Sequence, residues 1–194
     1  MKPPLLRAAK ANERRWRTQC PPATAALRSW LREAGSLSRR LAMTAPGFHV
    51  RVLGERRCRP LPGETRALGQ PARLWLWERD VLLCSHDQAF VYAHTVSRSA
   101  ARDAAWPLLR HLGGRPLGHL LFEVPGVRRS ALVFRRLRVG EALHQRITIA
   151  LGLPLPPLWV RRSLFALRGR RLLVSEVFLP AMTTLAPNAD PRER

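Results

Sequence analysis

Residues 74–96, LWLWERDVLLCSHDQAFVYAHTV, decide the fold. Two runs of apolar, aromatic and β-branched residues, 74–84 and 89–96, flank the polar tetrapeptide Ser85–Gln88. Such runs joined by a short polar turn predict a β-hairpin. Residues 160–167 and 172–179 repeat the pattern around Arg168-Gly169-Arg170, so a second hairpin is expected near the end of the chain.

Further elements are predicted on both sides of these hairpins. Phe48–Leu53 alternates as a strand that Gly54 closes, residues 54–73 form a connection, and residues 130–138 form another strand. Helices are expected at residues 24–33 with Thr24 as N-cap, after Ser36 or Ser38, at 100–112, and from Pro116. Helices mixed with strands joined mostly as hairpins favour an α+β fold, a single domain built on a largely antiparallel sheet.

Size and charge set limits on the function. The chain has 194 residues and 22.0 kDa, which suits one domain. We expect a basic, loose leader at 1–20, the folded domain at 21–182 and a flexible tail at 183–194. The net charge of +21 is almost wholly due to arginine, and it fits an anionic small molecule, an anionic membrane surface or nucleic acid.

The cysteines and the apolar stretches indicate the compartment. Cys20, Cys58 and Cys84 are odd in number and form no CxxC pair, so neither a disulfide framework nor a paired-cysteine zinc site is expected. Residues 1–20 lack the apolar region of a secretory signal. The longest apolar stretch, 147–160, is interrupted by three prolines and is too short to span a membrane. A cytoplasmic protein is the simplest interpretation.

Two charges stand where the strand pattern predicts burial. Arg79 shares a face with Trp75, Trp77, Val81 and Leu83, and Glu176 is the sole ionisable residue in 172–179. A buried lone charge costs several kcal/mol, so each needs a partner. One interpretation is a structural ion pair, with each other or with nearby charges. The other is an apolar pocket in which Arg79 binds a ligand carboxylate and Glu176 meets a polar group.

The blocks that carry these residues resemble bacterial chorismate lyases (chorismate–pyruvate lyases). They are WERDVLLC (77–84), GRPLGHLLF (114–122), RRS (161–163) and LLVSEVFLP (172–180), and the helix region 30–41 also fits. The likeness runs from Trp30 to Pro180. It implies an antiparallel sheet with helical flaps over an internal ligand site. It also implies conversion of chorismate to 4-hydroxybenzoate and pyruvate, the first committed step of ubiquinone biosynthesis, with no metal and no cofactor.

The resemblance also implies roles for particular residues. Arg79 and Glu176 become the catalytic pair, with Arg79 on a substrate carboxylate and Glu176 at the oxygen end of the ring. Leu37 and Leu117 become pocket walls, and Leu37 replaces a methionine of a related enzyme, a swap of similar volume. Because chorismate has two carboxylates, Arg161 or Arg162 is a candidate for the second, unless these are solvated charges at a strand end.

Of two rival functions, one remains open and the other is disfavoured. Effector domains of some bacterial transcription regulators resemble chorismate lyase in fold, so a non-catalytic domain that senses aromatic acids is the alternative. Specific nucleic-acid binding is not expected, because the arginines are spread along the chain and no aromatic RNA-binding strand motif occurs. We expect a monomer whose partners are chorismate and 4-hydroxybenzoate, with weak attraction to anionic membrane surfaces.

Overall fold

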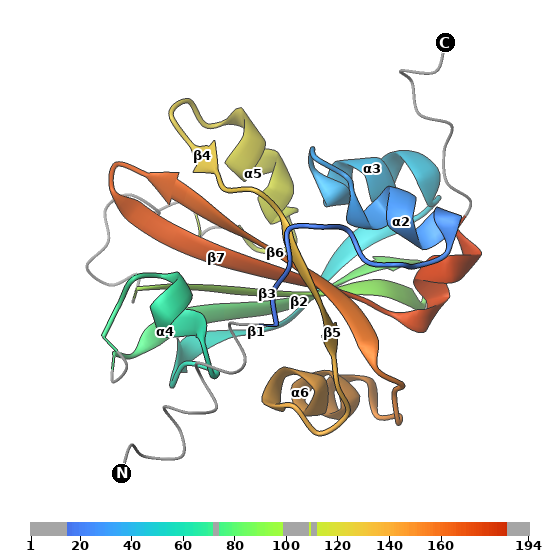
Figure 1. Ribbon diagram of the computed structural model, residues 1–194. Helices are drawn as coiled ribbons and strands as arrows, with labels where there is room; N and C mark the ends of the chain where they lie inside the picture. Colours follow the sequence, from blue (N-terminus) through green and yellow to red (C-terminus); the bar gives the residue numbers. More distant parts are fainter. Residues whose placement is uncertain (1–14, 72–73, 99–108, 110–111, 186–194) are drawn as a thin grey trace.

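The computed structural model describes residues 15–71, 74–98, 109 and 112–185. Its framework is a seven-stranded sheet in which every pair of neighbouring strands is antiparallel, in the order β1-β2-β3-β7-β6-β4, with β5 also on β6 (Figure 1). The strands are β1 (Phe48–Cys58), β2 (Leu76–Ser85), β3 (Gln88–Arg98), β4 (Arg128–Arg129), β5 (Val133–Leu137), β6 (Leu158–Leu167) and β7 (Arg170–Phe178). This confirms the predicted α+β fold on a largely antiparallel sheet.

Both predicted hairpins are present. His86-Asp87 joins β2 to β3 and Arg168-Gly169 joins β6 to β7. His86, Arg168 and Gly169 all have positive φ, which the tight turns between twisted antiparallel strands require. The β2–β3 and β6–β7 pairs put Arg79 and Glu176 near the middle of the sheet, because β3 pairs with β7.

Helices cover both faces of the sheet (Figure 1). On one side lie α2 (Ala25–Leu31), α3 (Leu37–Thr44) and α5 (Leu117–Glu123), and on the other lie α4 (Glu64–Ala67) and α6 (Ala142–Leu151). A 3-10 helix, η3 (Pro180–Thr184), follows β7. Among the described residues, no helix combines the length and the apolar character that crossing a membrane requires.

The predicted N-cap Thr24 is confirmed, and of the two serines predicted as candidates for the second helix it is Ser36 that caps it. Thr24 Oγ1 accepts a hydrogen bond from the backbone N–H of Leu27 at 3.4 Å, and Ser36 Oγ accepts one from Arg39 at 3.3 Å. Each satisfies an N–H group that the first turn of a helix leaves without a partner. The short link between the two helices lets Leu27, Trp30, Leu31, Leu37 and Leu41 pack as one buried cluster on β2.

Strand β1 is longer than predicted. Gly54 was expected to end it, but the register shifts between Val52 and Gly54 and pairing with β2 continues to Cys58. A bulge of this kind bends a strand without ending it. Beyond it, Glu55 lies opposite Arg79 and Arg56 opposite Glu78, so opposite charges favour pairing in a stretch whose composition predicts a loop.

Other boundaries also differ from those expected. The strand predicted at 130–138 is the shorter β5, and the two-residue strand β4 precedes it. Helix α6 lies between β5 and Pro157. Residues 15–20 of the expected leader lie against the sheet: the backbone N–H of Arg17 donates to Phe134 O at 2.9 Å. In the expected tail, Leu185 packs against the core, and residues 186–194 lie outside the described residues, as does most of the helix predicted at 100–112.

Candidate active site

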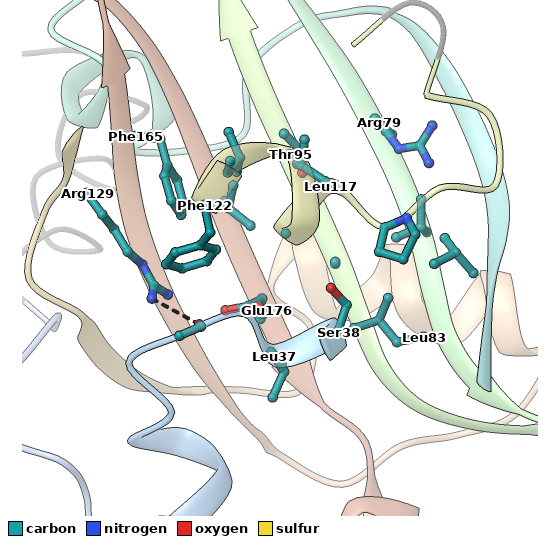
Figure 2. Close-up of a pocket in the computed structure, with 18 residues that line it drawn as sticks. Leu37, Ser38, Arg79, Leu83, Thr95, Leu117, Phe122, Arg129, Phe165 and Glu176 are labelled. Atoms are coloured by element: carbon teal, nitrogen blue, oxygen red, sulfur yellow. Dashed lines mark hydrogen bonds between the residues drawn. The ribbon is translucent and has the colours of Figure 1, made fainter. Parts of the chain in front are cut away.

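A cavity lies between the sheet and two helical segments that cover it, α3 with its preceding loop and α5 (Figure 2). We call these two segments the lids. The empty space among the lining residues is about 580 Å³, including the part that opens to solvent. The sheet contributes Val50, Arg79, Val81, Leu83, Ala93, Thr95, Arg129, Phe165, Val174 and Glu176, and the lids contribute Gly35, Leu37, Ser38, Pro116, Leu117, Gly118, Leu121 and Phe122. The wall is thus mainly apolar with a few polar groups, as in most small-molecule sites.

Arg79 is buried, with 2% of its surface exposed. One guanidinium nitrogen, Nη1, donates to Glu55 Oε1, and the other, Nη2, donates to the carbonyl of Gly113 at 2.6 Å. Glu55 is available because β1 continues beyond its bulge, and Gly113 belongs to the turn that leads to α5. Arg79 is therefore held between the edge strand and the base of one lid.

Glu176 lines the same cavity and has a different partner. Arg161, opposite it on β6, donates from Nε to Glu176 Oε2 at 2.6 Å. The described residues give Oε1 of Glu176 no hydrogen-bond partner, which leaves this oxygen for a ligand. Arg79 and Glu176 are thus not paired with each other; each is neutralised separately and both face one chamber.

The lids contribute the two leucines predicted as pocket walls. Leu37, the first residue of α3, is buried, and Leu117, the first residue of α5, is half-buried; both line the cavity. The lids meet closely, because a Cβ added to Gly118 would lie 2.7 Å from Ser38 Oγ and nearer still to Ser36 Oγ. Only glycine fits at this position without moving a neighbour.

Neither Arg161 nor Arg162 lines the cavity, so their expected contact with a second carboxylate does not match their position. Arg161 is fully buried beneath the end of α2, where Nη1 donates to the carbonyls of Trp30, Leu31 and Glu33 at 2.8–3.2 Å. The carbonyls of Trp30 and Leu31 belong to the last turn of α2 and carry the negative end of the helix dipole. The guanidinium of Arg162 lies 4.0 Å from the ring centre of Trp16.

A different arginine, Arg129 on β4, lines the cavity. Nε donates to Ser163 Oγ at 3.0 Å, and Nη1 donates to the carbonyl of Ala34 at 2.6 Å in the loop before α3. The sequence did not single it out, because the two-residue strand that positions it has no alternating pattern. Its only signal is that it follows another arginine in an arginine-rich chain.

The opposite face of β2 carries a buried ion-pair network. His94 lies between two carboxylates, with Nδ1 2.5 Å from Asp80 Oδ1 and Nε2 2.7 Å from Glu64 Oε1. Burial alone lowers the pKa of His94, but the charge of Glu64 and the hydrogen bonds of both carboxylates outweigh it and raise the pKa to about 10. Glu78 in turn pairs with Arg146 at 2.6 Å.

This network is close enough in geometry to resemble a metal site. One oxygen or nitrogen each of Glu78, Asp80 and His94 lie within 4.8 Å of one another. Both ring nitrogens of His94 are engaged by carboxylates, however, and arginines pair with Glu78 and Asp80. A protonated imidazole has no lone pair for a metal, so these residues form an ion-pair network rather than a metal site.

Comparison with known proteins identifies the family. Residues 14–186 match the family described as "Chorismate lyase". The chain belongs to the chorismate lyase family. A probable chorismate pyruvate-lyase of Thiobacillus denitrificans is 40% identical over 169 residues, which cover 87% of this chain and 90% of the relative. One of Cupriavidus pinatubonensis is 43% identical over 161 residues, covering 81% of this chain and 82% of the relative.

A solved structure of another class shares the chorismate lyase fold. The effector domain of PhnF from Mycobacterium smegmatis superposes with a TM-score of 0.55 at 11% identity, covering 75% of this chain and 89% of the domain. Identity this low shows the fold alone. The fold of this chain is therefore shared with the effector domain of PhnF.

Proposed function

We propose that this protein converts chorismate into 4-hydroxybenzoate and pyruvate, the reaction of the chorismate lyases, and so supplies the aromatic ring for ubiquinone. The observation that carries the proposal is that Arg79 and Glu176 face one mainly apolar chamber while each is neutralised by a partner of its own. A ligand can therefore enter between them without leaving either charge uncompensated.

The chemistry needs positioning more than activation. The bond between a ring carbon and the ether oxygen breaks, and the neighbouring ring carbon, which bears the hydroxyl, loses its hydrogen as a proton. The electron pair left behind completes the aromatic ring, and the released enolpyruvate takes up a proton at its methylene carbon to give pyruvate. Aromatisation drives the reaction, and good orientation can lower such a barrier by up to roughly 7–11 kcal/mol.

The proposed roles follow from this chemistry. The fork of Arg79 binds the ring carboxylate, which shares the guanidinium with Glu55. At the other end of the ring, Glu176 contacts the hydroxyl, orients the ring and assists proton movement. Leu37 and Leu117 exclude water, which strengthens the charge interactions inside the cavity.

The test is a reaction of the purified protein with chorismate. Chromatography should show 4-hydroxybenzoate, and a coupled lactate dehydrogenase assay should show an equal amount of pyruvate, both above a blank without protein. Glu176→Gln should lower kcat by about 100-fold or more, the usual effect of removing a group that assists proton transfer. A protein that binds 4-hydroxybenzoate but forms neither product would be a sensing domain instead.

The setting of the enzyme is part of the proposal. We infer a monomer in the cytoplasm, with chorismate and 4-hydroxybenzoate as its small-molecule partners and weak attraction to anionic membranes through its charge of +21. Light scattering on a gel-filtration column checks the mass. Sedimentation with anionic and with neutral vesicles checks the attraction, which should vanish in high salt.

A further inference from the structure

Arg129 is a cation at the cavity without an anionic partner among the described residues. Its contacts are with neutral groups: Ser163 Oγ, the carbonyls of Ala34 and Gly35, and the rings of Phe122 and Phe165, each with its centre 5.3 Å from the guanidinium carbon. These hydrogen bonds occupy Nε and Nη1 and leave Nη2 without a partner in the described part of the chain.

This makes Arg129 unlike the other buried arginines nearby. Arg79 pairs with Glu55 and Arg161 with Glu176. Burial lowers the pKa of Arg129, and Glu176 and Glu33 offset this only in part because the charge of Arg161 opposes them. A partly buried cation that has carbonyls and rings but no carboxylate is ready to accept an anionic ligand.

The position of Arg129 fits the second carboxylate of chorismate. Figure 2 shows Arg79 and Arg129 on opposite sides of the cavity, with Glu176 on the side of Arg129. In chorismate the ring carboxylate and the hydroxyl are at opposite ends of the ring, and the enolpyruvyl ether stands next to the hydroxyl. With the ring carboxylate on Arg79 and the hydroxyl at Glu176, the enolpyruvyl carboxylate extends toward Arg129.

We propose that Arg129 binds the enolpyruvyl carboxylate of chorismate, so that it recognises the substrate and not the aromatic product. This inference rests on the proposed function, because it needs the ring to be seated between Arg79 and Glu176. The product, 4-hydroxybenzoate, lacks this second carboxylate. Arg129 also contacts both lids, through Ala34 and Phe122, so the group that leaves as pyruvate is held where the lids meet β4.

The experiment compares substrate and product in the same variants. Arg129→Gln should raise the KM for chorismate by about 10- to 100-fold, the usual effect of losing a charged hydrogen bond. The dissociation constant of 4-hydroxybenzoate, measured by calorimetry, should stay within about threefold, because the product meets Arg129 only at long range. Arg129→Lys keeps the charge but loses the planar fork, and should raise KM less than Arg129→Gln.

Arg128→Gln is the matched control, because it removes the same charge from the neighbouring exposed side chain and should leave both constants unchanged. An unchanged KM in Arg129→Gln, or equal weakening of substrate and product, overturns the inference. If Arg129→Gln does not fold, the same comparison of KM with product affinity in Arg129→Lys decides. Wild-type protein that makes no product would refute the proposed function itself, a result distinct from all of these.

Discussion

The buried charges of the cavity show how single residues can be stabilised without closing the space between them. Arg79 is neutralised from the edge strand by Glu55, and Glu176 is neutralised from β6 by Arg161. Had Arg79 and Glu176 paired directly, a bound ring would have had to break a buried ion pair. The side chain of Glu55 remains 28% exposed, so it can adjust when a ligand carboxylate arrives.

Replacing Arg79 tests its proposed role most directly. We expect Arg79→Ala to lower kcat/KM for chorismate by at least about 30-fold, because truncating one partner of a buried charged contact costs about 2–5 kcal/mol. Steady-state kinetics measure the change, and melting curves check that the variant folds. Arg115→Ala, which removes an exposed arginine near the same lid, should leave kcat/KM unaltered. Near-normal turnover in Arg79→Ala would remove Arg79 from the mechanism.

The sequence pattern alone predicted individual site residues only where they broke it, whereas Leu37 and Leu117 were predicted from the family resemblance. Arg79 and Glu176 stood out because each interrupts an apolar face, and both line the cavity. Arg129 interrupts nothing, and it reaches the cavity through the pairing of β4 with β6, which links residues 128–129 to 165–166. Such long-range pairing is not visible in local sequence.

At the level of elements, the two lids depend on one close approach. Ser36 Oγ caps α3 and lies 3.1 Å from Ser38 Oγ, and both oxygens face the place where a side chain at Gly118 would begin. The lids can pack this tightly only because α5 has a glycine there. Their fit should therefore control how firmly a ligand is retained.

We expect Gly118→Ala to weaken 4-hydroxybenzoate binding by about 5- to 100-fold. The added methyl group would overpack the contact between the two lids, and overpacking costs about 1–3 kcal/mol. Stopped-flow measurement should locate most of the change in faster dissociation. Gly114→Ala is the control: its Cβ would lie 3.7 Å from the carbonyl of Val50, an ordinary contact. If both variants retain the product equally well, the lids do not govern release.

The ion-pair network behind β2 makes the packing of α4 and α6 dependent on pH. The folded protein holds the His94 proton up to a pKa of about 10, whereas an unfolded histidine loses it near 6.5. The stabilisation of the folded state by protonated His94 is therefore complete below about pH 6.5 and is lost as the pH rises toward 10.

Urea unfolding between pH 7 and 10 should show this loss, with up to about 1.4 kcal/mol less stability per pH unit. His94→Gln should be less stable at pH 7, because it leaves Asp80 and Glu64 without their shared partner, and its stability should change little between about pH 7 and 8.5. Burial raises the pKa of Cys58 and Cys84, so above that pH both proteins lose further stability through these thiols. His49→Gln, at an exposed histidine, should keep the wild-type slope. A wild-type profile that is flat from pH 7 to 10 would contradict the assignment.

Elements were predictable where local chemistry sets them. The turns at His86-Asp87 and Arg168-Gly169 and the caps Thr24 and Ser36 were predicted because turns and caps depend on neighbouring residues. The extension of β1 was missed because its second half is held by cross-strand charges on β2. These charges lie far away in sequence.

At the scale of the whole molecule, the protein has a net charge of +21, whereas its proposed substrate is a dianion. A field of this size raises the local concentration of an anionic substrate and speeds its encounter with the protein. Salt should therefore lower kcat/KM for chorismate, since the Debye length falls from ~30 Å at 0.01 M to ~8 Å at 0.15 M. Because the buried contacts are screened much less, kcat should stay constant. A kcat/KM that does not depend on NaCl would show that the charge serves another purpose.

Some of the arginines that give the protein its charge also affect the association of one copy with another. In the described part of the chain β1 is the last strand on its side of the sheet, so its outer backbone groups offer a template for another strand. The exposed side chains of Arg51, Arg56 and Arg57 line that border, and the bulge at Val52 and Gly54 bends it. If two copies approached edge to edge, these arginines would repel one another and the two bent strands would not fit together. Both effects disfavour fibrous aggregation in a concentrated solution.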